Sequence, residues 1–191
     1  MSHVDVAFAV SGGRLAQDHS LELWQALAQA APTLFADQSV AVLPVRGASA
    51  GDQGLVLQRR SRLLMRVPED KVDLALGLCG RRLDIAGAAL ELGEAKTRPL
   101  ASYATLYAHR VVATTDDEAA FVRQVAAELA RLEVSSEFIV GKRSVTRGPG
   151  GDIAGFSLML AELPSRQSLT LQVAGLGAHR ALGFGIFVGH K

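Results

Sequence analysis

The predicted order of strands and helices repeats after half of the 191-residue chain, and this repeat is the strongest constraint on the fold. Apolar and polar residues alternate in segment 3–10, as in a half-buried strand. Helical spacing of apolar residues then begins at Asp18 or Ser20 and ends before Pro32. A second long helix begins near Asp116, so the same unit is predicted to occur twice.

Each half of the chain is predicted to follow a β-α-β-β-α-β order. Further strand-like segments of the first half are 39–45, 61–67 and 81–92, with a short helix from Pro68. Those of the second half are 105–115, 137–145, 153–163 and 184–188, with a short helix opened by Pro164. The helix near Asp116 is predicted to bury one face made of Val122, Val125, Leu129 and Leu132. We therefore predict an α+β protein of two tandem ferredoxin-like modules, residues 1–96 and 97–191.

Composition excludes several classes of protein. The single cysteine, Cys79, excludes an internal disulfide and a cysteine-based zinc site, and it favours a cytoplasmic location. No apolar run reaches the roughly 20 residues that a membrane helix needs. The formal net charge is only +1, but basic residues outnumber acidic ones in segment 46–82 and after Glu137. This pattern suits either a polyanionic partner or ordinary solvated surfaces.

A glycine-rich segment, "GLGAHRALGFG", occupies residues 175–185 near the end of the chain. A dinucleotide-binding loop would follow the first strand and open a helix, and too few residues remain here for that helix. No Gly-Lys-Ser/Thr ends the pattern, so a Walker loop is excluded as well. Paired Gly-x-Gly units around His179 and Arg180 instead favour a loop whose amides approach a phosphate backbone.

The glycine pattern resembles the C-terminal signature of the RAMP superfamily of CRISPR-associated proteins. Within it, the chain is most similar to the repeat-cleaving endoribonucleases of the Cas-six family, in particular the compact subgroup labelled MYXAN. The segments that carry this likeness are "VDVAFAVSGGRLAQDHSLELWQAL", "SRLLMRVP", "RRLDIAGAALELG" and "SLTLQVAGLGAHRALGFGIFV". The resemblance implies the RAMP fold, in which two ferredoxin-like modules are followed by a glycine-rich loop.

The resemblance also implies an activity. Such a protein binds the repeat of a CRISPR precursor RNA and cuts it once per repeat, with no metal ion and no other cofactor. The 2′-hydroxyl attacks the adjacent phosphate, the 5′-oxygen leaves, and a 2′,3′-cyclic phosphate forms. The expected partners are the repeat RNA, the stem of the mature crRNA and other Cas proteins of a Cascade-type effector complex, with no membrane.

The cut needs a general base, a general acid and positive charge near the phosphate. Histidine suits either proton transfer at neutral pH, and His19 lies where the family carries its general acid or base. It follows a loop with two glycines, Gly12 and Gly13, which we expect to be flexible, and Arg14 of this loop is the expected phosphate contact. A partner for His19 remains open among Tyr103, Tyr107 and His109, while His3 and His190 lie close to the termini.

The remaining predicted RNA contacts fall into three groups. The first group consists of arginines expected to share one face of a strand: Arg60, Arg62 and Arg66. The second lies on an expected hairpin of the second module: Lys142, Arg143 and Arg147. The third is the glycine loop: Gly175, Gly177, His179, Arg180, Gly183 and Gly185. With only two tyrosines and one tryptophan, we expect backbone charge and stem shape, rather than base stacking, to dominate recognition.

Two other functions remain open. A RAMP subunit that only holds crRNA in an effector complex would keep the fold and the glycine loop, but it needs no histidine at the first helix. A ferredoxin-like module that binds a metabolite would carry its basic clusters incidentally, and it would show no salt-dependent affinity for RNA.

Overall fold

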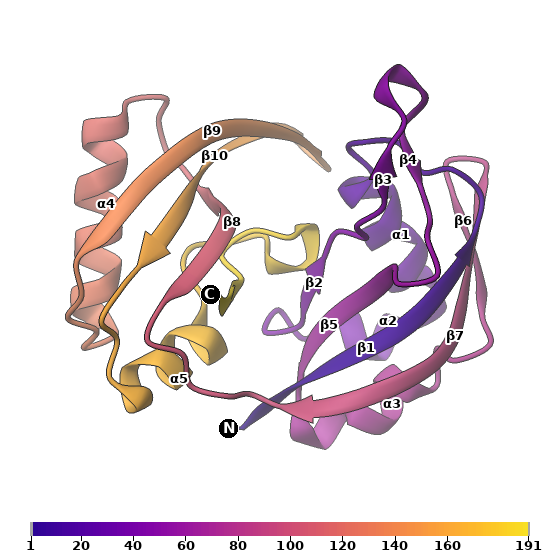
Figure 1. Cartoon of the computed structure of the whole chain (residues 1–191), viewed down its shortest axis with the longest axis horizontal. Helices are drawn as coiled ribbons and strands as arrows, with labels where there is room; N and C mark the ends of the chain where they lie inside the picture. Colours follow the sequence, from indigo (N-terminus) through magenta and orange to yellow (C-terminus); the bar gives the residue numbers. More distant parts are fainter. Residues whose placement is uncertain (1, 191) are drawn as a thin grey trace. The chain divides into compact units, whose positions relative to one another are not determined.

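The structure is a computed structural model that describes residues 2–190. The chain divides into two compact units, Met1–Pro99 and Leu100–Lys191. In Figure 1 the first unit runs from indigo to pink and the second from pink to yellow. Each unit has its own hydrophobic core.

The first unit contains a five-stranded antiparallel sheet in the order β2-β5-β1-β7-β6. Its strands are β1 (His3–Gly12), β2 (Ala41–Leu43), β5 (Arg62–Pro68), β6 (Arg82–Ile85) and β7 (Ala88–Pro99). Its helices are α1 (Ser20–Ala30), α2 (Pro32–Phe35), the 3₁₀ turn η2 (Glu69–Lys71) and α3 (Val72–Leu76). The strand-like segment 81–92 forms not one strand but two, β6 and the start of β7, which pair with each other across Gly87.

The alternation of apolar and polar residues along β1 places its apolar side chains in the hydrophobic core of the first unit. Val4, Val6, Phe8 and Val10 are all buried, as the sequence pattern predicts. They belong to the same core cluster as Leu63 and Met65 of β5 and Leu23 and Leu27 of α1. The apolar faces of the sheet and of α1 therefore cover each other.

The second unit has a four-stranded antiparallel sheet in the order β11-β8-β10-β9. Its strands are β8 (Leu106–Val112), β9 (Phe138–Gly148), β10 (Gly151–Leu160) and β11 (Phe187–Gly189), and its helices are α4 (Glu118–Arg131), α5 (Ser165–Ala174) and the 3₁₀ turn η3 (Arg180–Leu182). When the edge strand β6 is left out, the first sheet reads β2-β5-β1-β7. Numbered in chain order, these four strands and the strands β9-β10-β8-β11 both have the 2-3-1-4 order of a ferredoxin-like sheet. The predicted pair of ferredoxin-like modules is confirmed.

Helix α4 buries the predicted face except at its first residue, where Phe121 takes the place of Val122. Phe121, Val125 and Leu129 are buried, whereas Val122 is 39% exposed. The row of buried residues on α4 begins at Phe121 because the Phe121 ring packs on the Phe156 ring of β10, with 4.8 Å between the ring centroids. The N-cap residue Asp117 accepts hydrogen bonds from the amides of the first turn and sets the start of the helix.

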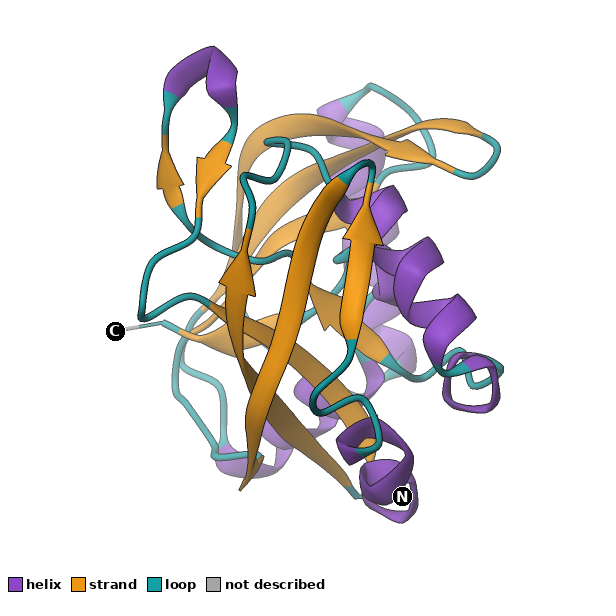
Figure 2. Ribbon diagram, turned by 90° about the vertical axis from the view of Figure 1, so that its right-hand side faces the viewer, coloured by secondary structure: helices purple, strands orange, loops and turns teal. Residues whose placement is uncertain are grey.

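A small hairpin in the first unit was not predicted from the sequence. Strands β3 (Ala48–Ser49) and β4 (Leu55–Val56) are joined by the 3₁₀ turn η1 (Gly51–Gln53). Figure 2 shows this hairpin standing away from the larger sheet, with η1 at its tip. Its strands have two residues each, too few for an alternating pattern to be detectable.

The longest helix, α4, has 14 residues. Across residues 2–190, no helix combines the length and the apolar character that crossing a bilayer requires.

The ion pair between Asp37 and Lys71 predicts a pH-dependent stability for the first unit. The Lys71 ammonium lies 2.5 Å from Asp37 Oδ2, and the Ser39 amide donates to Oδ1 at 2.8 Å. These contacts, chiefly the one from Lys71, lower the pKa of Asp37 from 3.8 to about 2. The folded state therefore holds its proton less tightly than the unfolded chain, so the stabilisation is complete above pH 3.8 and is lost as the pH falls toward 2.

We expect Asp37→Asn to lower the free energy of unfolding by about 1–2 kcal/mol at pH 7. Near pH 2 the variant and the parent should be equally stable. Urea unfolding at the two pH values measures the difference, and an equal loss at both would show that the charge of Asp37 is not responsible.

Candidate functional site

His19 lies at the N-cap of α1 with its imidazole buried, the residue being 2% exposed. Its Nδ1 is 2.8 Å from the Ala16 carbonyl oxygen, and its Nε2 is 3.1 Å from the Val45 amide nitrogen. Because the Val45 amide is a donor, Nε2 must accept and Nδ1 must carry the proton. The neutral ring therefore joins the loop before α1 to the segment that follows β2.

This geometry limits how His19 can take part in proton transfer. Both ring nitrogens are engaged by the backbone in the described conformation. Nε2 becomes available as a base only when the Val45 amide releases it, and a general base must reach the proton that it abstracts. The structure thus gives His19 a definite role in holding this loop, and proton transfer through Nε2 would require a local rearrangement.

Hydrogen bonds hold the loop between β1 and α1 in place, although its two glycines led us to predict a flexible loop. The Gly13 amide donates to the Ala89 carbonyl at 2.8 Å. Leu15 and Leu55 exchange two backbone hydrogen bonds of 3.0 and 2.7 Å, which join the loop to β4. The exposed side chain of Arg14 donates to the side-chain oxygen of Gln53 in η1. Arg14 is therefore at the surface, beside the tip of the β3–β4 hairpin.

The three arginines expected to line one groove do not do so. Arg66 is 1% exposed and binds Asp5 of β1 through two hydrogen bonds, from Nε to Oδ1 at 2.7 Å and from Nη2 to Oδ2 at 3.1 Å. A buried guanidinium committed to a carboxylate is an internal ion pair, because losing either partner would leave a charge uncompensated. Arg60 lies in a turn before β5, and exposed Arg62 donates to the carbonyls of Arg59 and Ser61.

The β9–β10 hairpin brings the second basic group together on one strand. Lys142, Arg143 and Arg147 all lie on β9 and are exposed. The Arg143 guanidinium pairs with Asp116 before α4, with 2.5 Å between Nη2 and Oδ1. Pairing with β10 shifts register just before Arg143, so Lys142 lies at an irregularity of the strand. This hairpin presents a cationic edge to solvent.

The glycines of segment 175–185 are required by close backbone contacts. Gly185 has a φ of +65°, and a Cβ placed on it would lie 2.0 Å from the Leu176 carbonyl oxygen. A Cβ placed on Gly175, whose φ is +68°, would likewise lie 2.6 Å from the Gly185 carbonyl oxygen. The loop is therefore folded tightly on itself, and residues 177–179 are its exposed part.

Two polar groups of the loop are already engaged. Arg180 is buried and its Nη1 donates to the Val173 and Ala174 carbonyls at the end of α5, which corrects its expected role as a phosphate contact. The Gly177 amide donates to the Glu128 carboxylate at 2.7 Å. An amide that binds a carboxylate has the geometry to bind a phosphate oxygen once the carboxylate leaves. Glu128, on α4, was not singled out from the sequence.

The ring residues left open as partners of His19 lie in the second unit. Tyr107 and His109 share a face of β8, with ring centroids 4.8 Å apart and planes at 86°. His190, close to the terminus, lies on the other side of Tyr107 at 5.7 Å. Tyr103 instead faces Gly189, whose missing side chain leaves room for the tyrosine ring. No pattern in the sequence signals the approach of His190 to Tyr107.

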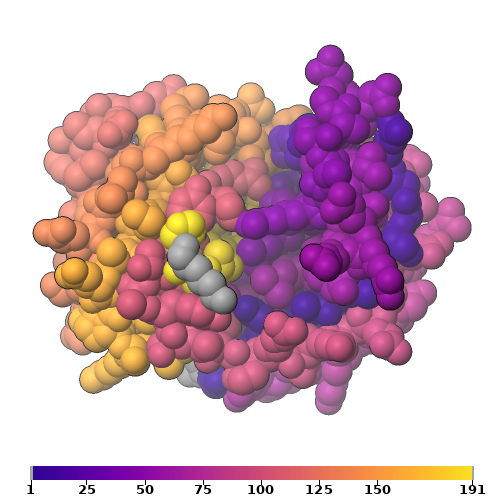
Figure 3. Space-filling model, in the orientation of Figure 1, coloured from indigo at the N-terminus to yellow at the C-terminus, as the bar shows by residue number. Residues whose placement is uncertain are grey.

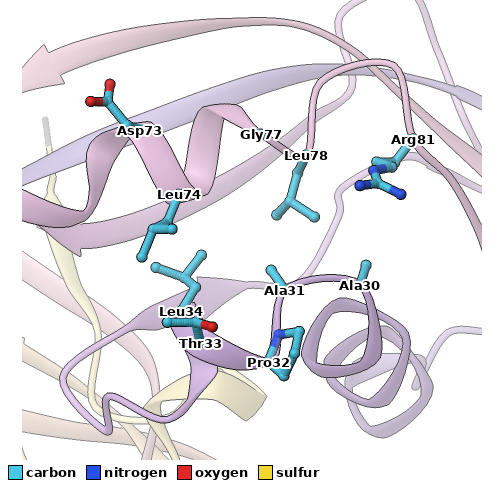
Figure 4. Close-up of a pocket in the computed structure, with 10 residues that line it drawn as sticks. All are labelled: Ala30, Ala31, Pro32, Thr33, Leu34, Asp73, Leu74, Gly77, Leu78 and Arg81. Atoms are coloured by element: carbon cyan, nitrogen blue, oxygen red, sulfur yellow. The ribbon is translucent and has the colours of Figure 1, made fainter.

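The pocket beside α2 is mainly apolar, and the histidine, cysteine and acidic side chains of the described residues are dispersed. No group of three or more His, Cys, Asp or Glu side chains within residues 2–190 is placed to hold a metal. A pocket of about 290 Å³ lies between the end of α1, α2 and α3, and Figure 4 shows its lining. Leu34, Leu74 and Leu78 dominate it, while Asp73 points away from them. It lacks the convergent polar groups of a metabolite site.

Comparison with known proteins gives a consistent result. The family model described as "Cas6 Crispr" matches residues 4–191. A curated relative, "CRISPR-associated endonuclease Cas6" of Myxococcus xanthus (strain DK1622), is 34% identical over 189 residues, which is 98% of this chain and 82% of the relative.

Solved structures agree on the fold. A Cas6-related protein of Pyrococcus furiosus superposes with a TM-score of 0.72 at 11% identity, covering 97% of this chain and 98% of that one. A structure described as "An RAMP protein binding different RNA substrates" gives a TM-score of 0.70 at 12% identity, with both chains fully covered. The matched family model and the curated relative together show that this chain belongs to the Cas6 (Cas-six) family of CRISPR-associated proteins.

Proposed function

We propose that this chain binds CRISPR repeat RNA and cleaves precursor crRNA within each repeat to produce guide crRNA. The observation that carries the proposal is its 34% identity, over 98% of its length, to a protein named as a CRISPR-associated endonuclease. The exposed cations of β9 and the outer residues of the glycine loop support it, because they suit a phosphate backbone. The released crRNA stem and other Cas proteins of an effector complex are the partners that we propose.

The proposed reaction uses no metal ion. The 2′-hydroxyl loses its proton and attacks the adjacent phosphorus, the 5′-oxygen leaves with a proton, and a 2′,3′-cyclic phosphate remains. His19 transfers one of these protons once RNA binding has displaced the Val45 amide from Nε2. Arg14, exposed in the same loop, stabilises the negative charge of the transition state.

A second function is favoured by one observation. The buried ring of His19 bonds to the backbone through both nitrogens, as a purely structural histidine would. If the Val45 contact persists in the RNA complex and no other group transfers the proton, the chain is a subunit that holds crRNA without cutting it.

Cleavage of the repeat RNA from the same genome in excess EDTA tests the proposal. We expect two products, with a cyclic phosphate on the upstream one, and no cleavage when the nucleotide at the cut carries a 2′-deoxyribose. Binding without any cleavage would support the non-cleaving subunit. A requirement for Mg²⁺ would contradict the metal-independent reaction, and a lack of binding would contradict both functions.

A further inference from the structure

One face of the second unit's sheet carries a row of apolar side chains that crosses all four strands. The strand register places Val188 of β11 opposite Tyr107 of β8, Tyr107 opposite Met159 of β10, and Met159 opposite Ile139 of β9. Directly paired residues of antiparallel strands lie on the same face. The neighbouring row, Leu106, Leu158 and Leu160 among others, points the other way into the core with α4. We call the first row, with His109 and His190, the ring platform.

The ring platform is exposed to solvent. Ile139 is 63% exposed, His109 and His190 are exposed, and Tyr107, Met159 and Val188 are partly exposed. Figure 3 shows the C-terminal residues, in yellow, at the surface beside the pink segment that contains β8. Tyr107 stands between the two imidazoles, edge-on to His109 and tilted toward His190. This arrangement fixes the tyrosine ring and leaves apolar surface in water.

The charge of the sheet suits a polyanion. Its four strands contain four arginines or lysines, Arg110, Lys142, Arg143 and Arg147, and a single carboxylate, Asp152. Arg110 lies on the face of the ring platform, since its neighbour Val111 points into the core. Arg143 is paired with the core residue Phe156, so Arg143, Arg147 and Asp152 lie on the opposite face. Asp152 pairs in register with Arg147 beside the hairpin turn, seven residues along β10 from Met159. No carboxylate therefore lies in the row that forms the ring platform.

The glycine loop reaches the same face of the sheet. A Cβ on Gly155 of β10 would lie 3.0 Å from the Phe184 ring, so this ring covers the strand there. The Arg110 guanidinium lies 5.2 Å from the centroid of the same ring. Gly155 and Met159 share this face because the residues that alternate with them on β10, Phe156, Leu158 and Leu160, all belong to the core on the other side. The loop therefore packs on the same face of the sheet as the ring platform.

We propose that the ring platform binds an unpaired nucleobase of the RNA by stacking, chiefly on Tyr107. This inference rests on the proposed function, since it names the part of the RNA that the surface takes. Every base has a π-face, so aromatic stacking is tolerant of sequence. The small number of aromatic residues in the sequence predicts recognition without stacking. Two of the chain's five histidines and one of its two tyrosines nevertheless lie together in the ring platform.

Binding of two RNAs to Tyr107→Leu tests the ring platform. One probe is a single-stranded oligoadenylate of about ten nucleotides, and the other is a blunt RNA duplex without unpaired bases. We expect Tyr107→Leu to weaken oligoadenylate binding about tenfold and to leave duplex binding unchanged. Tyr107→Phe keeps the ring and should bind as the parent does.

Tyr103→Leu is the matched control, because it removes the other tyrosine, which packs against Gly189, and it should not change either affinity. His190→Ala changes an exposed ring beside Tyr107 and should weaken oligoadenylate binding about threefold, even if Tyr107→Leu proves unstable. A 2-aminopurine base in the oligonucleotide should lose fluorescence on binding the parent but not Tyr107→Leu.

Equal oligoadenylate affinities of the parent, Tyr107→Leu and His190→Ala would overturn the ring platform, as would a parent that binds the duplex but not the oligoadenylate. In both cases the proposed RNA function would stand. If the parent bound neither these probes nor the repeat RNA, the proposed function would fail as well.

Discussion

Replacing His19 with glutamine is expected to lower the rate of repeat cleavage by about 10²–10⁴-fold while the protein stays folded. The glutamine side chain has an oxygen that can accept from the Val45 amide and an NH₂ group that can donate, but it cannot transfer a proton at neutral pH. His19→Gln therefore separates the structural role of the ring from its proposed chemical role. Single-turnover cleavage with saturating repeat RNA, together with thermal unfolding, measures the two effects.

His19→Ala is the companion variant. It removes both backbone contacts of the ring and leaves a cavity, so we expect it to lose stability as well as cleavage. Unchanged cleavage by a folded His19→Gln protein would assign His19 a structural role alone. The proton transfer would then have to come from another group.

Gly185→Ala should destabilise the second unit by about 4 kcal/mol. The new Cβ would lie 2.0 Å from the Leu176 carbonyl oxygen, at a φ of +65° that side chains rarely adopt. The backbone would have to move, and with it the hydrogen bonds from Leu176 to Gly185 and from Gly185 to Arg110. Chemical denaturation monitored by circular dichroism measures the loss.

Gly87→Ala is the matched control for this prediction. Gly87 has a similar positive φ of +86°, but a Cβ added there would point into open space, with no contact within 4 Å. We expect a cost of about 1 kcal/mol, which is the backbone conformational penalty alone. Equal losses at both positions would show that the close contact in the glycine loop has no energetic weight.

The order and type of most elements follow from the sequence because apolar periodicity reports which face of each element is buried. Strand β1 is the clearest case, with Val4, Val6, Phe8 and Val10 all buried as predicted. The buried face of α4 was predicted wrongly at one residue, since Val122 and Phe121 are both apolar and only the packing of Phe121 on Phe156 selects between them. The β3–β4 hairpin was missed because its strands are too short to show a period.

The candidate site was predicted less well, because a charged residue's role depends on its partner. Arg66 looks like a surface cation in the sequence, but Asp5, 61 positions away, lies beside it on the neighbouring strand. Arg180 looks like a phosphate ligand, but it folds back onto the carbonyls at the end of α5. By contrast, Lys142 and Arg147 lie on an edge strand and are exposed, as their predicted hairpin position suggested.

The sequence by itself determined the duplicated ferredoxin-like architecture, because strand and helix periods and the paired glycines are local properties of the chain. The sequence also shows membership of the Cas6 family, through the match to the family model and to the curated relative. Only the tertiary structure decided which polar side chains are engaged and which rings meet. Pairing across strands brings together residues such as Tyr107 and Met159, or Arg66 and Asp5, and no local pattern encodes the register that joins them.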